Sequence, residues 1–282
     1  MKSGIRKSAI AGTWYPGSSR VLAAEIEKYF RNVPKSPPRG YVVSLIAPHA
    51  GYVYSGQVAA YAYKEVRGQA YDSVVIIGPS HRAYFPGCSV CSRGGFETPL
   101  GIVPVDSATA GRIIAAGLTI SDTPDVHEQE HSIEIQLPFL QVALGTFQFV
   151  PILMGRQDRK TCEDLAEALV GAVVGRNILI VASSDLSHYH PYDEAVRMDS
   201  GILKCIEEIR PDDLLKDMER GLSEACGGGP VAAAMKAAKK LGADRAAVLR
   251  YANSGDVTGD RSSVVGYAAA MIYKRWSNSG DR

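Results

Sequence analysis

Three apolar runs in the sequence each end at a histidine-bearing turn: Val42-Val-Ser-Leu-Ile-Ala-Pro-His49, Ser73-Val-Val-Ile-Ile-Gly-Pro-Ser-His81 and Asn177-Ile-Leu-Ile-Val-Ala-Ser-Ser-Asp185-Leu-Ser-His188. Continuous apolar runs of this length predict strands that are buried on both faces, as in a parallel or mixed sheet between helices. Sheets of this kind bind ligands beyond the carboxyl ends of their strands. We therefore expect three imidazoles and a carboxylate to converge on one crevice.

The remainder of the chain alternates between strand and helix patterns. Turn residues and helical spacing predict a helix after His49 with Ser55 as its N-cap, and a second helix over residues 132–144 that begins at Ser132. Short hairpins are predicted over residues 86–104, and a glycine turn over residues 226–230 before a helix over residues 231–240. No Pro-, Gly- or Ser-rich linker interrupts the chain, so residues 1–282 are predicted to form a single three-layer α/β/α domain with a central, largely parallel or mixed sheet.

Composition limits the classes of partner. The 31 Lys and Arg residues balance 30 Asp and Glu residues, so no bulk charge attracts a polyanion and nucleic acid is not expected as a partner. No apolar segment reaches the length of a signal peptide or a membrane span, which predicts a cytoplasmic protein without membrane association. Five cysteines at scattered spacing indicate free thiols, and the Cys88-Ser-Val-Cys91 pair is predicted to lie on a strand with its thiols on opposite faces.

His49 and His81 are the strongest candidates for metal ligands. Pro48 directly precedes His49, and Pro79 lies two residues before His81. Gly51 and Gly78 permit tight turns, so both imidazoles are expected to be held at strand ends. A fixed pair of neutral imidazoles suits a divalent ion such as iron, zinc or copper. A single histidine is more often a hydrogen-bonded structural residue, and it is the matched placement of two that favours a metal site.

The third run adds an acid and two further histidines, Asp185, His188 and His190. Asp185 is expected to ligate a metal or to orient a histidine, and His188 to act as a general acid or base because its ordinary pKa lies near neutrality. His190 is a neighbour without an assigned role. Tyr52, Tyr54 and His190 are candidates for lining the pocket, although packing or surface roles are at least as common for the two tyrosines.

A rival motif is His127-Glu-Gln-Glu-His131, which matches the HExxH pattern of zinc peptidases. That chemistry requires both histidines on one face of a continuous helix. Here the apolar helical stripe begins only at Ile133, so His131 is predicted to precede the helix. The sequence context therefore disfavours a peptidase.

Several motifs in the same order resemble the Memo family, and the resemblance spans nearly the whole chain. The motifs are Gly12-Thr-Trp-Tyr15, Ala47-Pro-His-Ala-Gly-Tyr52, Gly78-Pro-Ser-His81, Glu130-His-Ser-Ile-Glu-Ile-Gln-Leu-Pro138, Ser183-Ser-Asp185 with His188, Cys226-Gly227 and Asp260-Arg-Ser-Ser-Val-Val-Gly-Tyr-Ala268. Memo proteins are similar in fold to the catalytic subunit of class III extradiol dioxygenases, which hold non-heme Fe(II) with two histidines and a glutamate. The resemblance implies that His49 and His81 are ligands and that Cys226 replaces the glutamate. It also implies that Asp185 and His188 complete the pocket, with His188 at the position of the dioxygenase base.

A cysteine in place of a glutamate changes the expected chemistry. A thiolate is a softer donor than a carboxylate, so Fe(II) is the first expectation, copper or zinc are also suited, and no nucleotide cofactor is expected. A thiolate beside a redox metal and O₂ is itself oxidisable.

Two functional hypotheses follow. The first is a metal-dependent oxidoreductase that acts on an unidentified small molecule. The second is a non-enzymatic metal-binding or regulatory protein, because the resemblance implies relatives that act as signalling adaptors, bind peptide segments of receptors, or accompany a radical-SAM protein. A shared fold does not decide between them.

Overall fold

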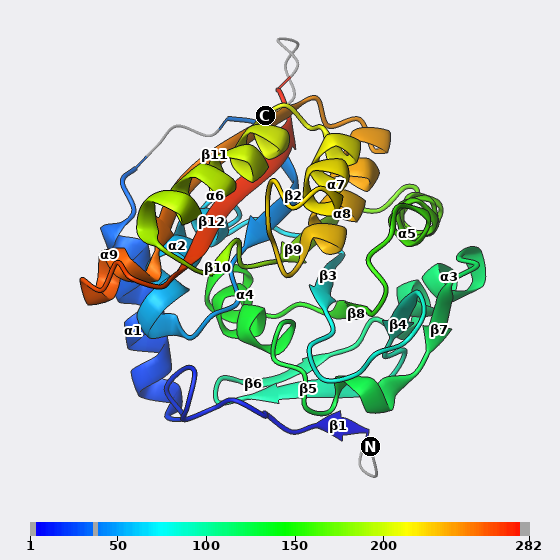
Figure 1. Cartoon of the computed structure of the whole chain (residues 1–282). Coiled ribbons are helices and arrows are strands. Elements are labelled where there is room, and N and C mark those ends of the chain that lie inside the picture. Colours follow the sequence, from blue (N-terminus) through cyan, green and yellow to red (C-terminus); the bar gives the residue numbers. More distant parts are fainter. Residues whose placement is uncertain (1–3, 36–38, 277–282) are drawn as a thin grey trace.

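The computed structural model describes residues 4–35 and 39–276, and its central element is a mixed β-sheet with helices on both faces (Figure 1). The α-helices are α1 (Ser19–Asn32), α2 (Tyr52–Lys64), α3 (Ser107–Ala116), α4 (Leu137–Leu144), α5 (Arg159–Ala172), α6 (Tyr192–Glu207), α7 (Pro211–Glu219), α8 (Gly228–Lys240) and α9 (Ser254–Thr258), with short 3-10 helices η1 (Pro124–His127) and η2 (Glu134–Gln136). The strands are β1 (Ile5–Arg6), β2 (Tyr41–Ala47), β3 (Ser73–Pro79), β4 (Cys88–Val90), β5 (Gly95–Thr98), β6 (Gly101–Pro104), β7 (Ile120–Asp122), β8 (Phe149–Met154), β9 (Ile178–Ser183), β10 (His188–His190), β11 (Arg245–Asn253) and β12 (Val264–Lys274).

The three apolar runs form the centre of the large sheet. Its order is β10-β12-β2-β9-β3-β8-β4-β7, with β11 paired to β12, and β2, β9, β3 and β8 run parallel to one another. Strands β12 and β4 pair antiparallel with β2 and β8 respectively, so the sheet is mixed. This arrangement confirms the predicted α/β class and the predicted strands.

Two apolar clusters pack on the opposite faces of the sheet, which gives the three layers. Along β3, Val75 and Ile77 contribute to the cluster beneath α3, α5, α6, α7 and α8, whereas Val74 and Ile76 contribute to the cluster beneath α1, α2 and α4. This alternation is the period of two that a strand imposes on its side chains. The small sheet β1-β5-β6, which contains the predicted hairpin of β5 and β6, packs on the second cluster.

Cys88 begins β4 and Cys91 directly follows it, and their thiols lie on opposite faces of the sheet as predicted. Cys88 belongs to the first apolar cluster and Cys91 to the second, and both are buried free thiols. Burial raises the pKa of each. Across residues 4–35 and 39–276, no helix is both long and apolar enough to cross a membrane.

Two predicted helix starts, those capped by Ser55 and Ser132, are wrong. Helix α2 begins at Tyr52 after Gly51, because the Ser55 hydroxyl turns back to donate to the Ala50 carbonyl instead of capping a later start. Helix α4 begins only at Leu137, after the 3-10 helix η2, because Ser132 donates its hydroxyl to the Pro79 carbonyl at the end of β3.

The predicted glycine turn before residue 231 is shorter than expected. Helix α8 begins at Gly228, so Gly228, Gly229 and Pro230 form its first turn. Proline is tolerated there because the first backbone N–H groups of a helix have no partner within the helix.

A buried ion pair ties the N-terminal strand to the segment that precedes α4. Arg6 Nη1 lies 2.5 Å from Glu134 Oε2, and both side chains are almost fully buried. The other guanidinium nitrogens donate to the His127 and Glu130 carbonyls, each at 2.6 Å. Tyr15 donates its hydroxyl to the second Glu134 oxygen at 2.7 Å. The ion pair therefore holds residues 127–134 in place.

We predict that Glu134→Gln destabilises the protein by about 3–5 kcal/mol at neutral pH, because it leaves the Arg6 charge buried without its partner. Burial alone would raise the pKa of Glu134, but Arg6 and the hydrogen-bond donors outweigh it and the pKa is lowered. A carboxyl with a depressed pKa stabilises the fold above its unfolded pKa of about 4.3, and this contribution is lost as the pH falls further.

Denaturant unfolding from pH 7 to pH 3 should therefore show the difference between wild type and variant shrinking on the acid side. The exposed ion-pair variant Glu97→Gln serves as the control, with an expected change under about 1 kcal/mol. A difference that stays constant across this pH range would contradict the assignment.

Candidate metal centre

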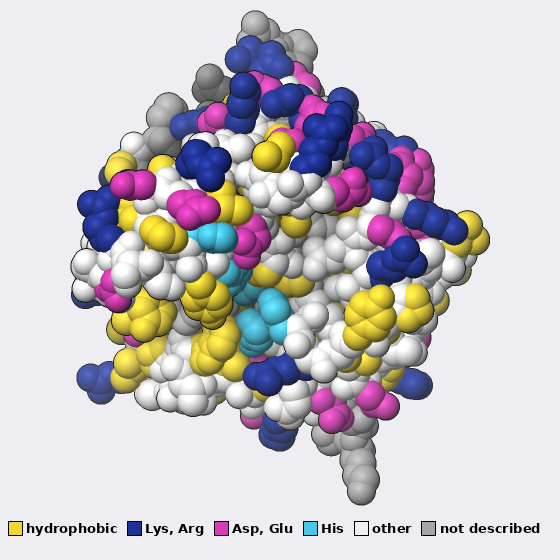
Figure 2. All heavy atoms as spheres, viewed as in Figure 1, with side chains coloured by type: hydrophobic (Ala, Val, Ile, Leu, Met, Phe, Trp, Pro, Cys, Tyr) yellow, Lys and Arg dark blue, Asp and Glu magenta, His cyan; other side chains and the backbone are white. Residues whose placement is uncertain are grey.

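The three central parallel strands deliver one chemical group each to the same edge of the sheet. His49, His81 and Asp185 are each the second residue after their strand, β2, β3 and β9 respectively. Strand β9 lies between the other two, so Asp185 follows a strand that is flanked by the strands leading to the two histidines. In Figure 2, histidine side chains gather in a hollow near the centre of the face shown, with hydrophobic side chains beside them.

Cys226 reaches this edge from the loop before α8. Its Sγ lies 3.0 Å from His49 Nε2, and one donor atom from each of His49, His81 and Cys226 lies within 4.8 Å of the others. Gly227 permits the approach, because a Cβ there would lie 2.3 Å from the Ser183 carbonyl oxygen and 2.7 Å from the Ser184 Cβ. The structure thus brings together the three residues predicted as ligands.

Hydrogen bonds fix the proton position on His49. Ser183 Oγ donates its only hydrogen to the Ser132 carbonyl at 2.6 Å and accepts from Gln136 Nε2 at 2.8 Å. The same oxygen, 2.9 Å from His49 Nδ1, can therefore only accept from it. His49 carries its proton on Nδ1, and Nε2 faces the Cys226 thiol with a free lone pair.

The His49 imidazole and the Cys226 thiol are both held in their neutral forms. Burial lowers the pKa of His49 well below its usual range, and the neighbouring His131 and His81 lower it further. Burial, followed by the Asp185 carboxyl, raises the pKa of Cys226. A neutral imidazole beside a thiol is the form in which such a pair accepts a metal ion in exchange for the thiol proton.

Asp185 shapes the turn that carries His49. Its Oδ1 accepts the backbone N–H of His49 at 2.7 Å and that of Ala50 at 3.3 Å, and its Oδ2 lies 4.0 Å from His49 Nε2. Burial raises its pKa to about 7, although those two N–H donors oppose the shift. Asp185 therefore holds the backbone of the turn that carries His49.

His188 and His190 lie at the rim on either side of a strained residue. Tyr189 between them has φ 63°, which is uncommon for a residue with a side chain, and its ring is 76% exposed. Glu224 Oε2 lies 2.8 Å from His190 Nε2, and Glu224 Oε1 lies 3.7 Å from His188 Nδ1. Burial lowers the pKa of His188, with Glu224 opposing it.

The two tyrosines proposed to line the pocket have different surroundings. Tyr54 is 43% exposed. Tyr52 is not a lining residue: it is 3% exposed, its ring packs on Phe139 and its hydroxyl donates to the Ile135 carbonyl. As the first residue of α2, it faces the apolar cluster under that helix.

Two residues near the centre, Glu130 and His131, belong to the rival motif but had no predicted role beside His49 and His81. The His131 ring stacks on the His81 ring with centroids 4.5 Å apart. The centroid of the Trp14 ring lies 4.3 Å from that of the His131 ring. Burial lowers the pKa of His131 to about 4, with Glu130 opposing. Gly78 lets their segment approach β3, since a Cβ there would lie 2.5 Å from Ser132 Oγ. The sequence feature that could have identified these two residues is the charged motif at residues 127–131, directly before an apolar helix.

The peptidase geometry is absent from the described segment 124–144. His127 ends the 3-10 helix η1, and His131 lies outside any helix, as predicted. His127 is buried with Nε2 3.2 Å from Ser89 Oγ, whereas the His131 ring contacts the rings of His49 and His81. The His127 and His131 rings therefore contact different residues.

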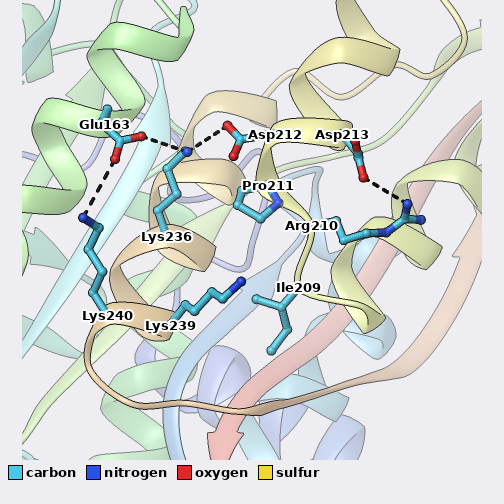
Figure 3. A pocket seen from close by; sticks show the side chains of 9 residues that line it. All are labelled: Glu163, Ile209, Arg210, Pro211, Asp212, Asp213, Lys236, Lys239 and Lys240. Atoms are coloured by element: carbon cyan, nitrogen blue, oxygen red, sulfur yellow. Dashed lines mark hydrogen bonds and ion pairs between the residues drawn. The ribbon is translucent and has the colours of Figure 1, made fainter.

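A separate cavity of about 360 Å³ lies away from the histidines, among α5, α7 and α8 (Figure 3). Lys236 Nζ lies 2.8 Å from both Glu163 and Asp212, and Arg210 pairs with Asp213. The ion pairs of Lys236 link α8 to Glu163 of α5 and Asp212 of α7, which indicates a structural network between the helices.

Comparisons with known proteins agree with the motifs. The family described as Memo-like protein matches residues 6–271. A MEMO1 family protein of Aeropyrum pernix is 41% identical over 282 residues, covering 95% of this chain and 99% of the relative. MEMO1 family proteins of Ignicoccus hospitalis and Methanopyrus kandleri are 39% and 37% identical, covering 95% and 96% of this chain and 98% and 99% of the relatives. The chain belongs to the Memo family.

Proposed function

We propose that this chain binds one transition-metal ion through His49, His81 and Cys226 and uses it in an oxidoreductase reaction. The observation that carries the proposal is the His49 and Cys226 pair, in which a lone pair fixed by Ser183 faces a thiol at 3.0 Å. His81 completes a set of three donor atoms within 4.8 Å. Two imidazole nitrogens and one sulfur suit Fe(II), copper or zinc better than magnesium or calcium, and Fe(II) is our first candidate.

The chain's own groups would divide the work at this centre. A redox-active ion there would supply one-electron chemistry and open positions for small molecules. His188, which is half-buried at the rim beside Glu224, would move a proton to or from the substrate. Asp185 would keep the His49 turn in place through its two backbone hydrogen bonds. His81 is 31% exposed, which leaves an approach to the centre from solvent.

We predict that the protein purified without oxygen binds about one Fe(II) or copper ion per chain. His49→Ala, His81→Ala and Cys226→Ser each remove a donor atom and should weaken binding at least 100-fold, as measured by metal analysis after dialysis and by competition with a chelator. His190→Gln is the control and should retain the ion, because His190 pairs with Glu224 at the rim. Undiminished binding in all three ligand variants would rule out this site.

We also predict that metal binding releases the proton of the Cys226 thiol. Because the Cys226 thiol must lose its proton to become a ligand, binding should release about one proton per ion, and the apparent affinity should rise about tenfold per pH unit below the thiol's pKa. Calorimetric titrations in buffers of different ionisation enthalpy measure the released protons. In Cys226→Ser the release should vanish, and an unchanged release in that variant would contradict thiolate ligation.

The sulfur ligand also favours a second candidate, a metal-binding regulatory protein without turnover. A thiolate beside a redox metal is exposed to oxidation in every catalytic cycle, whereas a protein that only holds or delivers the ion avoids repeated contact with oxidants. In that case a protein partner, such as the radical-SAM protein suggested by the family resemblance, would bind the metal-loaded form of the chain.

Oxygen consumption distinguishes the two candidates. If the protein is an oxidoreductase, the chain loaded with Fe(II) without oxygen should consume O₂ faster when members of a catechol panel are added. In His188→Ala the stimulation of O₂ consumption should then be at least tenfold smaller than in wild type. The variant should retain the ion, because the substitution removes only the proton-moving group. Metal binding without stimulated uptake by any panel member would favour the regulatory candidate.

A further inference from the structure

We propose that Glu130 is the positioning residue for His81, fixing its proton on Nδ1 and holding its ring so that Nε2 is presented as the ligand atom. The inference rests on the metal binding proposed above and adds a residue to which nothing so far gives a role. It is carried by the contacts of one buried carboxylate.

Glu130 is 2% exposed and accepts four N–H hydrogen bonds. Its Oε2 accepts the His81 backbone N–H at 2.6 Å, and its Oε1 lies 2.9 Å from His81 Nδ1. Oε1 also accepts the backbone N–H groups of His131 and Ser132 at 2.9 and 3.0 Å. The carboxylate thus grips both the backbone and the ring of His81.

The backbone donors around Glu130 determine the proton position on His81. Both carboxylate oxygens already accept backbone N–H groups, Oε2 from His81 and Oε1 from His131 and Ser132. An oxygen that accepts those hydrogen bonds also acts as an acceptor toward His81 Nδ1, so Nδ1 carries the hydrogen. Nε2 is then left with its lone pair free.

His81 needs this support more than His49 does. The His49 side chain is 3% exposed and is enclosed by the protein, whereas the His81 side chain is 31% exposed. An exposed imidazole without an anchor samples several rotamers and both neutral tautomers, and metal binding must then select one of them. Glu130 on one edge and the stacked His131 ring on one face restrict that freedom.

Glu130 itself is better suited to orientation than to ligation. Donor atoms of His81, Glu130 and His131 also lie within 4.8 Å of one another, which defines a second set of candidate ligands. An ion held there would compete with the four N–H groups that already donate to Glu130. A carboxylate that accepts the second N–H of a metal-binding histidine is instead the usual support of such a ligand.

The first test compares metal affinities of the full-length protein. A Gln at position 130 presents an NH₂ group to donors that now meet an oxygen, so Glu130→Gln should bind Co(II), a spectroscopic stand-in for Fe(II), about 10–100-fold more weakly than wild type. Glu128→Gln is the matched control, since Glu128 is exposed two residues earlier in the same segment, and its affinity should stay within about twofold. Equal affinities of wild type and Glu130→Gln, or equal losses in both variants, would overturn the inference.

The second test needs no metal and does not depend on a substitution at Glu130. Long-range ¹H–¹⁵N NMR spectra of the metal-free wild-type protein report which nitrogen of each imidazole carries the hydrogen, with His81→Gln used to assign the signal. We expect His81 as the Nδ1–H tautomer, and an Nε2–H or mixed tautomer would overturn the inference. If His81 shows the Nδ1–H tautomer while wild type binds no metal, the proposed function fails and the role of Glu130 in holding His81 stands.

Discussion

The parallel pairing of β2, β9 and β3 is the constraint on which the centre depends. Three neighbouring strands that run the same way must end at one edge, and each places its second following residue there, namely His49, Asp185 and His81. Burial of both sheet faces by two apolar clusters holds these strands in register. Displacing any of the three strands along its axis would move its polar group away from the others, so the packing of the core and the geometry of the centre are inseparable.

Hydrogen-bond acceptors behind the two histidines orient their rings, Ser183 for His49 and Glu130 for His81. Ser183 has already donated its hydrogen, and both Glu130 oxygens accept backbone N–H groups, so each residue presents an acceptor to the Nδ1 of its histidine. Burial then keeps His49 neutral, because no charged imidazole is favoured away from water. The supporting groups therefore define the state of the donor atoms before any ligand arrives.

Two glycines and one ion pair bring distant segments to this edge. Gly227 and Gly78 leave room for the Cys226 loop and for the Ser132 segment, where a side chain would collide with Ser183 or Ser132. The Arg6 and Glu134 pair holds the segment that contains Glu130 from its other side. Cys226 is 177 residues from His49 in the chain, and only this close packing makes the two neighbours.

The sequence by itself determined the α/β class, the three central strands, the family, and the residues His49, His81 and Asp185 at strand ends, because strand periodicity and turn chemistry are local. Local patterns also placed His131 before its helix. They misplaced the starts of α2, α4 and α8. The Ser55 and Ser132 hydroxyls donate to the carbonyls of Ala50 and Pro79 instead of capping helices, and Gly228 and Gly229 lie within the first turn of α8. Only the tertiary structure decided that Tyr52 is a core residue and that Glu130 and His131 adjoin the centre, because those contacts join segments about 50 or more residues apart in the chain.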